Sequence, residues 1–281
     1  MAKAEVSRAL PAGAWAAKAR SLGRRLASAS AEHQLTTYAS AIAFRSLVAL
    51  VPLTLLGLAL LHVFGLEEVW RNSIAPAVKA HATQAAYNAI DFSVEKIFAS
   101  GTAGLIAFGA ALLLWDMAAA VLTSMQALNE IHDVEEGRSW PRRLLVSVGL
   151  AAAVIVCVVA SVLVIILGPR PDGVAHVIFG IARWPLAILL LGLALGLLVR
   201  YGPAEHPEPR WASAGSLAVI CSWILATVGF KWWISSVANF KTATGTLTAF
   251  LVLTAYVFVS AAIFLLGVQL DELLRKRSRG S

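Results

Sequence analysis

Two charged residues stand inside otherwise apolar runs of this chain and are its first candidates for chemistry. Arg45 lies in the run from Tyr38 to Phe64, and Asp116 lies in the run from Gly101 to Leu128. A charge near the centre of a membrane helix costs about 2.5 to 3.5 kcal/mol, so such residues normally face a bundle interior, water or an opposite charge. Helical rise places both at similar depths, where they could pair. The alternative is that Arg45 extends to the headgroups while Asp116 caps a backbone group.

Pro52 and Gln269 complete the candidate intramembrane polar site. Pro52 removes the hydrogen bond that its amide would have made to Val48, which bends a helix and frees a carbonyl towards a neighbouring helix or a polar cavity. Gln269 lies at the end of the last apolar run and can donate and accept hydrogen bonds without carrying charge. The sharpest hypothesis is that Arg45 and Asp116 interact, directly or through water, beside a cavity kinked open at Pro52.

A second candidate is the loop motif Arg200-Tyr201-Gly202-Pro203, which follows the fourth apolar run. We predict a cytoplasmic turn that fixes the fourth span against the fifth, with Tyr201 at the interface and Arg200 near phosphates or helix ends. An ordinary topogenic loop is the alternative.

Catalytic and metal-binding patterns are not found in the sequence. The six histidines are scattered, and no pair has the spacing of metal ligands. Cys157 and Cys221 lie in the middle of separate spans, where we interpret them as small apolar residues. We therefore expect no cofactor, no metal and no enzymatic activity.

The elements that would position these residues follow from composition. Of the 281 residues, 59% are hydrophobic and 14% charged, and the mean hydropathy is +0.76, which excludes an ordinary soluble domain. A helix needs about 20 mostly apolar residues to cross a bilayer. Strict alternation is absent, so the spans are helices and not barrel strands. The sequence predicts an all-α polytopic membrane protein with a transmembrane domain over 34–270 and spans at about 38–64, 101–128, 144–168, 174–199, 211–234 and 246–270.

Three segments flank or connect these spans. Residues 1–33 are basic and Ala-rich, and we predict a cytoplasmic helix near anionic headgroups, with no cleavable signal peptide visible. Residues 271–281 form a basic cytoplasmic tail. In the loop 65–101, Asn72 or Ser73 can cap a helix, and Pro76 suits its first turn. Apolar residues recur after it, so we predict one amphipathic helix along the outer interface or capping the bundle.

Orientation follows from Lys and Arg, which are enriched in cytoplasmic loops. Fifteen lie on the side of the two termini and six on the other. The fifteen are Lys3, Arg8, Lys18, Arg20, Arg24, Arg25, Arg138, Arg142, Arg143, Arg200, Arg210, Arg275, Lys276, Arg277 and Arg279. We therefore predict that both termini are cytoplasmic. The net charge of +7 is explained by topology, so no nucleic-acid partner is expected.

Four segments in order resemble the YihY/BrkB-like bacterial inner-membrane proteins, over most of residues 30–275. They are Thr36–Leu53, similar to the first-span signature of the family, Ala127–Ile131 after the second span, Arg200–Pro203 after the fourth, and Gly245–Asp271 at the close. The chain departs from the family in three places. The family usually has a small or aromatic residue at position 45, Tyr-Gly in place of Thr244-Gly245, and Glu in place of Gln269.

The resemblance implies a six-helix, multi-pass inner-membrane protein linked to envelope integrity, with some members tied to serum resistance or lipid export. An older ribonuclease label on the family finds no matching site in these residues. One expected function is a transporter or flippase-like protein handling a lipid-like or anionic amphipathic molecule; the bilayer and a bound lipid-like substrate would be its partners. The alternative is a structural component or partner-binding scaffold. A cavity reaching Arg45 would favour the first, and a tightly packed bundle with an apolar outer patch the second.

Overall fold

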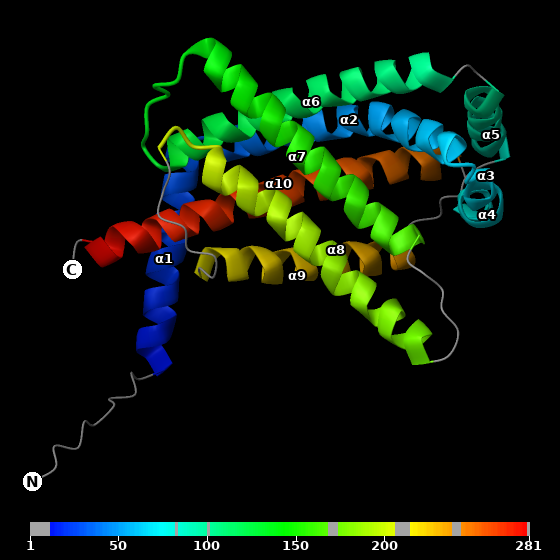
Figure 1. Ribbon diagram of the computed structural model, residues 1–281. Coiled ribbons are helices and arrows are strands. Elements are labelled where there is room, and N and C mark those ends of the chain that lie inside the picture. Colours follow the sequence, from blue (N-terminus) through cyan, green and yellow to red (C-terminus); the bar gives the residue numbers. More distant parts are fainter. Residues whose placement is uncertain are drawn as a thin grey trace, which may run out of the picture.

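The computed structural model describes residues 12–81, 84–99, 102–167, 174–205, 214–237 and 243–279. Within these ranges the chain is helical, and no strand occurs (Figure 1). The elements are α1 (Ala12–Glu32), α2 (Leu35–Val63), α3 (Glu67–Val69), the π-helix η1 (Trp70–Ile74), α4 (Ala75–His81), α5 (Gln84–Ala99), α6 (Thr102–Ile131), α7 (Trp140–Leu167), α8 (Val174–Tyr201), α9 (Ala214–Val237) and α10 (Ala243–Arg279).

The predicted all-α membrane fold is confirmed. Helices α2, α6, α7, α8 and α10 are each long and apolar enough to cross a bilayer, and α9 contains a shorter apolar stretch, Ala218–Ile234. The last helix is longer than the predicted span, because α10 continues without a break from the apolar run into the basic tail and ends at Arg279. No Gly or Pro interrupts residues 268–279, so nothing in that stretch favours a helix end.

The six long helices form a row in the order α9, α10, α2, α6, α7, α8. Helix α2 packs along α6 and α10, α7 packs on α6 and α8, and α9 packs on α10. In the described ranges, α8 and α9, the two ends of the row, do not pack along one another. We call the end of the bundle where α6 and α8 terminate the basic end, after Arg138, Arg142 and Arg143. The opposite end, which carries α3 to α5, is the cap end (Figure 1).

Helix α1 runs across the ends of the spans instead of along them (Figure 1). It packs on α10 and on the start of α2. The change of direction occurs at Gln34, whose φ of 49° and ψ of 37° place it in the left-handed region, a conformation that commonly ends helices. His33 is buried immediately before this turn, so the turn brings an imidazole to the basic end.

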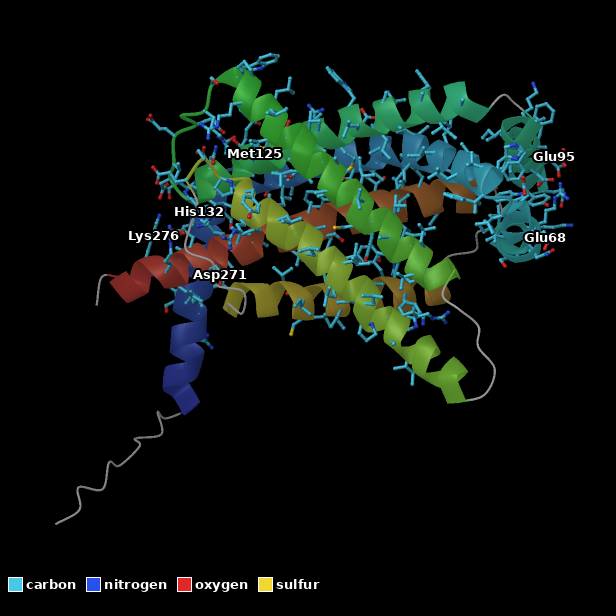
Figure 2. The ribbon with its side chains drawn as sticks, viewed as in Figure 1. Glu68, Glu95, Met125, His132, Asp271 and Lys276 are labelled. Carbon is cyan, nitrogen blue, oxygen red and sulfur yellow. The ribbon has the colours of Figure 1, made fainter. Side chains whose placement is uncertain are left out.

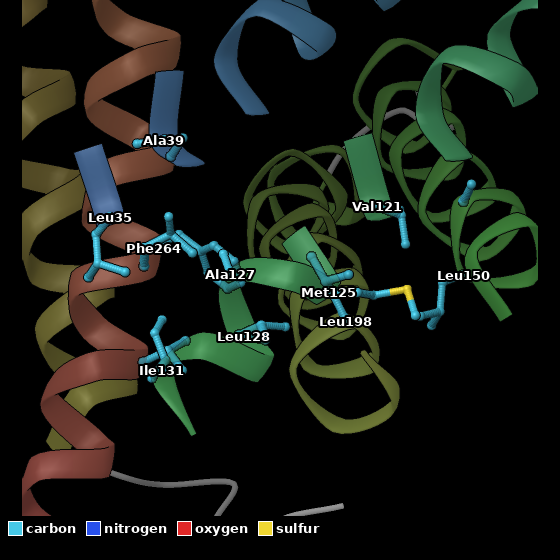
Figure 3. Close-up of a cluster of buried hydrophobic side chains, with 14 of the residues drawn as sticks. Leu35, Ala39, Val121, Met125, Ala127, Leu128, Ile131, Leu150, Leu198 and Phe264 are labelled. Atoms are coloured by element: carbon cyan, nitrogen blue, oxygen red, sulfur yellow. The ribbon is translucent and has the colours of Figure 1, made fainter. Parts of the chain in front are cut away.

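The main hydrophobic core lies towards the basic end. Met125, Leu128 and Ile131 of α6 are fully buried and belong to the same cluster as Leu265 of α10 and Leu35 of α2. Figure 3 shows part of this cluster, with Met125 beside Leu150 of α7. Small residues such as Ala39 and Ala127 lie among them and let the helix backbones approach closely. The bundle is therefore held together mainly by its basic half.

The connection at the cap end differs from the single amphipathic helix that we predicted. Two helical segments, Glu67–His81 and Gln84–Ala99, replace it. They pack on each other and on α2 through Trp70, Ala75 and Val94, which form a separate small core. Packing as two segments lets them bury their apolar faces together, whereas one long interfacial helix would leave that face to lipid. Residues 82 and 83, between the segments, lie outside the described ranges.

Candidate functional site

The structure does not join the two intramembrane charges. Arg45 is exposed on α2 beside Phe44, whereas the packed side of this turn carries Ala39 and Ala43. Two residues turn a helix by about 200°, so Arg45 points away from that packed side. Asp116 is partly buried on α6, and no ion pair or hydrogen bond joins it to Arg45 in the described part of the chain. A direct pair is therefore absent from this arrangement, and contact through water stays a prediction.

Pro52 lies buried within α2, which remains helical on both sides of it. Two residues further on, the hydroxyl of Thr54 donates a hydrogen bond to the carbonyl of Leu50 at 2.7 Å. Whether Pro52 borders a cavity stays a prediction.

Gln269, in contrast, belongs to a polar network at the basic end. Its Oε1 lies 2.8 Å from Nδ1 of His33, and Nε2 of the same imidazole lies 3.5 Å from Oδ1 of Asp133. Asp133 also pairs with Lys276 of α10. The hydrogen bond from Lys276 is the main reason that the pKa of Asp133 lies below its ordinary value. The chain of contacts therefore ties the α1–α2 turn to the ends of α6 and α10.

A second part of the network joins His132 to α10. Nδ1 of His132 lies 2.9 Å from Oε2 of Glu272, and Arg275 approaches the same carboxylate at 2.8 Å. The side chains of His132 and Glu272 are 9% and 2% exposed, so this is a buried charge cluster. Burial lowers the pKa of His132, although Glu272 acts in the opposite direction. A neutral His132 that donates from Nδ1 leaves its buried Nε2 without a hydrogen-bond partner in the described structure.

Figure 2 shows how these side chains gather at one end of the molecule. His132, Asp271 and Lys276 lie near the basic end, whereas Glu68 and Glu95 lie at the cap. Three elements supply the network, namely the α1–α2 turn, the end of α6 and the last turns of α10.

The loop after α6 is organised around Glu136. Arg138 donates to Oε1 from Nε at 2.7 Å and to Oε2 from Nη2 at 3.0 Å, and Asn129 donates to Oε2 at 3.0 Å. The hydrogen bonds from Arg138 are the main cause of the lowered pKa of Glu136. A bidentate guanidinium–carboxylate contact fixes direction as well as distance, so it orients Arg138 towards the next element.

That next element is the turn after α8. Nη2 of Arg138 donates to the carbonyl of Gly202 at 2.7 Å, and the amide of Ala204 donates to Oδ1 of Asn129 at 2.8 Å. A Cβ added at Gly202 would lie 2.9 Å from Cδ1 of Leu128 and would overlap the carbonyl of Leu198. Only glycine therefore lets this turn approach α6 so closely.

The turn at Arg200–Pro203 was predicted to fix the fourth span against the fifth, and that contact stays a prediction. In the described part of the chain the turn holds α8 against α6 and the α6–α7 loop. The reason is that Asn129 and Arg138 satisfy the backbone groups that the turn exposes. Tyr201 is exposed with the guanidinium of Arg200 5.6 Å from its ring centre, and Pro203 is buried. The segment 206–213 that continues to α9 lies outside the described residues.

Helix α9 is attached to α10 at a close crossing. The amide of Gly215 donates to Oδ1 of Asp271 at 2.7 Å. A Cβ at Gly267 would overlap Val219, and one at Gly215 would overlap the carbonyl of Gly267. Two glycines thus bring the helix backbones together, as small residues commonly do in membrane bundles.

Helices α8, α9 and α10 expose apolar side chains in the middle of the bundle and towards the cap end. They are Ile181, Trp184 and Ile188 on α8, Leu225, Val228 and Trp232 on α9, and Phe250 and Leu251 on α10. Helix α9 keeps contact with α10 through Thr227 and Phe230, which meet the hydroxyl and the ring of Tyr256. No comparable packing joins α8 to α9 in the described part of either helix.

Sequence reasoning identified Gln269 and the Arg200–Pro203 turn but missed most of their partners. His132 and Glu272 were missed because each follows an apolar run and reads as an ordinary solvated span end. The available signal was the pair Asp271-Glu272, two acids inside a basic tail. Among the described residues, no three His, Cys, Asp or Glu side chains gather as a metal site would require.

Comparison with known proteins places the chain among membrane proteins. Residues 26–281 match the family model described as virulence factor BrkB. YfkH of Bacillus subtilis (strain 168), named a ribonuclease-like protein, is 22% identical over 88% of this chain and 92% of its own length. UPF0761 membrane proteins of Halorhodospira halophila and Methylibium petroleiphilum are 26% and 27% identical over 95% and 84% of this chain.

The chain spans only 60% and 58% of the lengths of those two UPF0761 proteins. No solved structure matches the chain significantly. The family model covers the part of the chain that carries the polar network and all six long helices. The chain therefore belongs to the BrkB family of membrane proteins.

Proposed function

We propose that this chain is a transporter or flippase-like protein that handles a lipid-like or anionic amphipathic molecule. The observation that supports the proposal is the unequal packing of the two ends of the bundle. The basic end is closed by a buried polar network, whereas in the described ranges α8 and α9 do not pack along one another and expose apolar side chains from the middle of the bundle to the cap end. A bundle open on one side and closed at one end resembles one state of an alternating-access cycle.

The candidate polar site fits such a molecule. Arg45 is exposed within a span, where an uncompensated cation is costly. An anionic headgroup passing beside it would provide the missing counter-charge. Asp116, Pro52 and Gln269 remain proposed parts of the same path.

The test is lipid translocation in proteoliposomes. The protein is reconstituted with fluorescent phosphatidylglycerol or phosphatidylcholine, and dithionite quenching measures the fraction of label that changes leaflet. We expect faster exchange of phosphatidylglycerol than in protein-free vesicles, and a loss of that gain in Arg45→Leu. Arg71→Leu, which removes an exposed cation from the cap end, is the matched control. Equal rates with and without protein for both lipids would contradict the proposal.

A partner-binding scaffold is the second candidate. The observation in its favour is the cap, where Phe92 of α5 is 61% exposed on a segment outside the long helices, and Ala89, one turn earlier on the same face, is exposed as well. Exposed apolar side chains grouped on one surface often mark an interaction site. Cross-linking from a photoreactive residue at position 92, with position 95 as control, would reveal a defined partner. If translocation is absent and a defined partner appears, the scaffold replaces the transporter.

Location and orientation complete the proposal. We propose a bacterial inner-membrane location with both termini in the cytoplasm, supported by the excess of Lys and Arg at the basic end. Impermeant thiol reagents on intact spheroplasts should label Asn88→Cys and spare Ser139→Cys, in a background with Cys157 and Cys221 replaced. The reverse labelling pattern would contradict the proposed orientation.

We further propose that the chain is not an enzyme and needs no cofactor.

A further inference from the structure

A groove opens between α1 and α10 at the basic end, outside the candidate polar site. It is lined by Ser21, Leu22 and Arg25 of α1 and by Leu273 and Leu274 of α10, and its volume is about 110 Å³. This volume holds several water molecules, which is enough for a phosphate group. One wall is therefore polar and cationic, and the other is apolar.

Helix α1 presents two different faces around this groove. Leu22, Leu26, Ala29 and His33 recur at helical spacing and are partly or fully buried, so they form the packed face. Arg20, Arg24 and Arg25 are exposed. A basic amphipathic helix that runs across the ends of membrane spans lies at the depth of lipid headgroups (Figure 1).

The charge of Arg25 is not neutralised by the described protein. No carboxylate in the described ranges forms an ion pair with its guanidinium. The acids that precede Leu273 are already engaged, since Glu272 binds His132 and Arg275, and Asp271 accepts the amide of Gly215. The guanidinium of Arg25 therefore remains available to an external anion at this position.

We propose that the groove binds the phosphate of an anionic phospholipid headgroup. Arg25 contacts the phosphate through two parallel N–H donors, as a guanidinium does with phosphate oxygens. Ser21, four residues earlier on the same helix face, lies beside it, and Leu273 and Leu274 contact the glycerol and the first methylenes. The apolar wall favours a lipid over free inorganic phosphate, which has no apolar part. The lipid would hold α1 against α10, and this role does not depend on transport.

Native mass spectrometry of the detergent-solubilised full chain tests the proposal. Palmitoyl-oleoyl phosphatidylglycerol and phosphatidylcholine are added separately, and the bound fraction is measured against lipid concentration. The wild type should retain phosphatidylglycerol in preference to phosphatidylcholine. Arg25→Gln should weaken retention about tenfold or more, since it removes a charge-assisted contact. Arg25→Lys should lose less, because it keeps the charge without the planar donors.

Arg20→Gln is the matched control, because Arg20 is an exposed cation of the same helix that does not line the groove. The Arg20→Gln variant should retain phosphatidylglycerol to within about twofold of the wild type. Leu274→Asp puts a carboxylate in the opposite wall and should weaken the retention of phosphatidylglycerol on its own. The thermal midpoint of each variant shows whether it is folded.

Equal losses in Arg25→Gln and Arg20→Gln would overturn the proposal, as would equal retention of both lipids. Displacement of the lipid by millimolar inorganic phosphate would instead assign the site to free phosphate. If the protein moves no lipid in proteoliposomes, the proposed transport fails, but the binding of phosphatidylglycerol in this groove is still tested by mass spectrometry alone.

Discussion

The basic half and the cap half of the bundle use the same residue types in different ways. In the basic half, Leu265 and Met125 are fully buried, and charged side chains on α6 and α10 are satisfied by one another. In the cap half, Trp232 and Ile181 are 69% and 65% exposed, and in the described ranges α8 and α9 do not pack along one another. A polar network thus fixes one end, while the other has the small core of Trp70, Ala75 and Val94 and exposed apolar side chains on α8 and α9. The comparison indicates that relative motion of the helices is easiest at the cap end.

The largest expected effect comes from breaking the buried charge cluster. Glu272→Leu should lower the free energy of unfolding in detergent by about 3 to 5 kcal/mol, because it leaves Arg275 and His132 without their carboxylate. Glu68→Leu, at an exposed acid of the cap end, should change it by less than about 0.5 kcal/mol. The double variant His132→Leu/Glu272→Leu should recover part of the loss. Equal effects at the two ends would remove the distinction between them.

The same comparison can be made for apolar side chains with one buried and one exposed leucine. Leu265→Ala should cost about 2 to 5 kcal/mol because the side chain is fully buried and leaves a cavity. Leu225→Ala, at a side chain 74% exposed, should cost well under 1 kcal/mol. Thermal or denaturant unfolding of both variants in the same detergent provides the measurement. A similar loss for Leu225→Ala would show that α9 packs more tightly than the structure indicates.

These two ends also differ in how well they could be predicted. The long apolar runs predict long helices, and α2, α6, α7 and α8 begin and end within four residues of the predicted bounds, because bilayer thickness sets the length of such runs. The network was not predictable, since His33, His132 and Glu272 lie about 100 or more residues apart in sequence and meet only after the helices pack. The cap was predicted as one helix because periodicity cannot show that two segments bury their faces together.

A smaller effect is expected from acidification at the basic end. Burial holds the pKa of His132 below its ordinary value of 6.5, so the unfolded chain binds more protons than the folded chain just below that pH. The free energy of unfolding should therefore decrease as the pH falls below 6.5, and this decrease should end once the pH lies below the pKa of His132 in the folded chain. Thermal midpoints measured from pH 8 to pH 5 should fall less steeply in His132→Asn than in the wild type. An identical slope in both would exclude His132 as the source.

The smallest expected effect concerns the two intramembrane charges. Arg45 is exposed and forms no direct ion pair with Asp116 in the described structure, so any coupling between the two residues runs through water and should be small. In a double-mutant cycle of Arg45→Leu and Asp116→Leu, the coupling free energy should be below about 0.5 kcal/mol. A coupling free energy above about 1 kcal/mol would show that Arg45 and Asp116 interact, directly or through water, and would place Arg45 on the packed side of α2.

The open row of helices is tested most directly by disulfide cross-linking in native membranes, with Cys157 and Cys221 replaced. Two control pairs span packed interfaces. Val219→Cys/Gly267→Cys joins α9 to α10, where a Cβ at position 267 would lie 3.4 Å from the Cβ of Val219, and Ser161→Cys/Ala187→Cys joins α7 to α8. The test pairs Ile188→Cys/Val228→Cys and Leu191→Cys/Leu225→Cys lie at similar distances in sequence from the ends of α8 and α9 that face the basic end. A disulfide needs Cα atoms within about 7 Å. We predict that oxidant cross-links both control pairs and neither test pair. Cross-linking of the test pairs as fast as the controls would contradict the open arrangement.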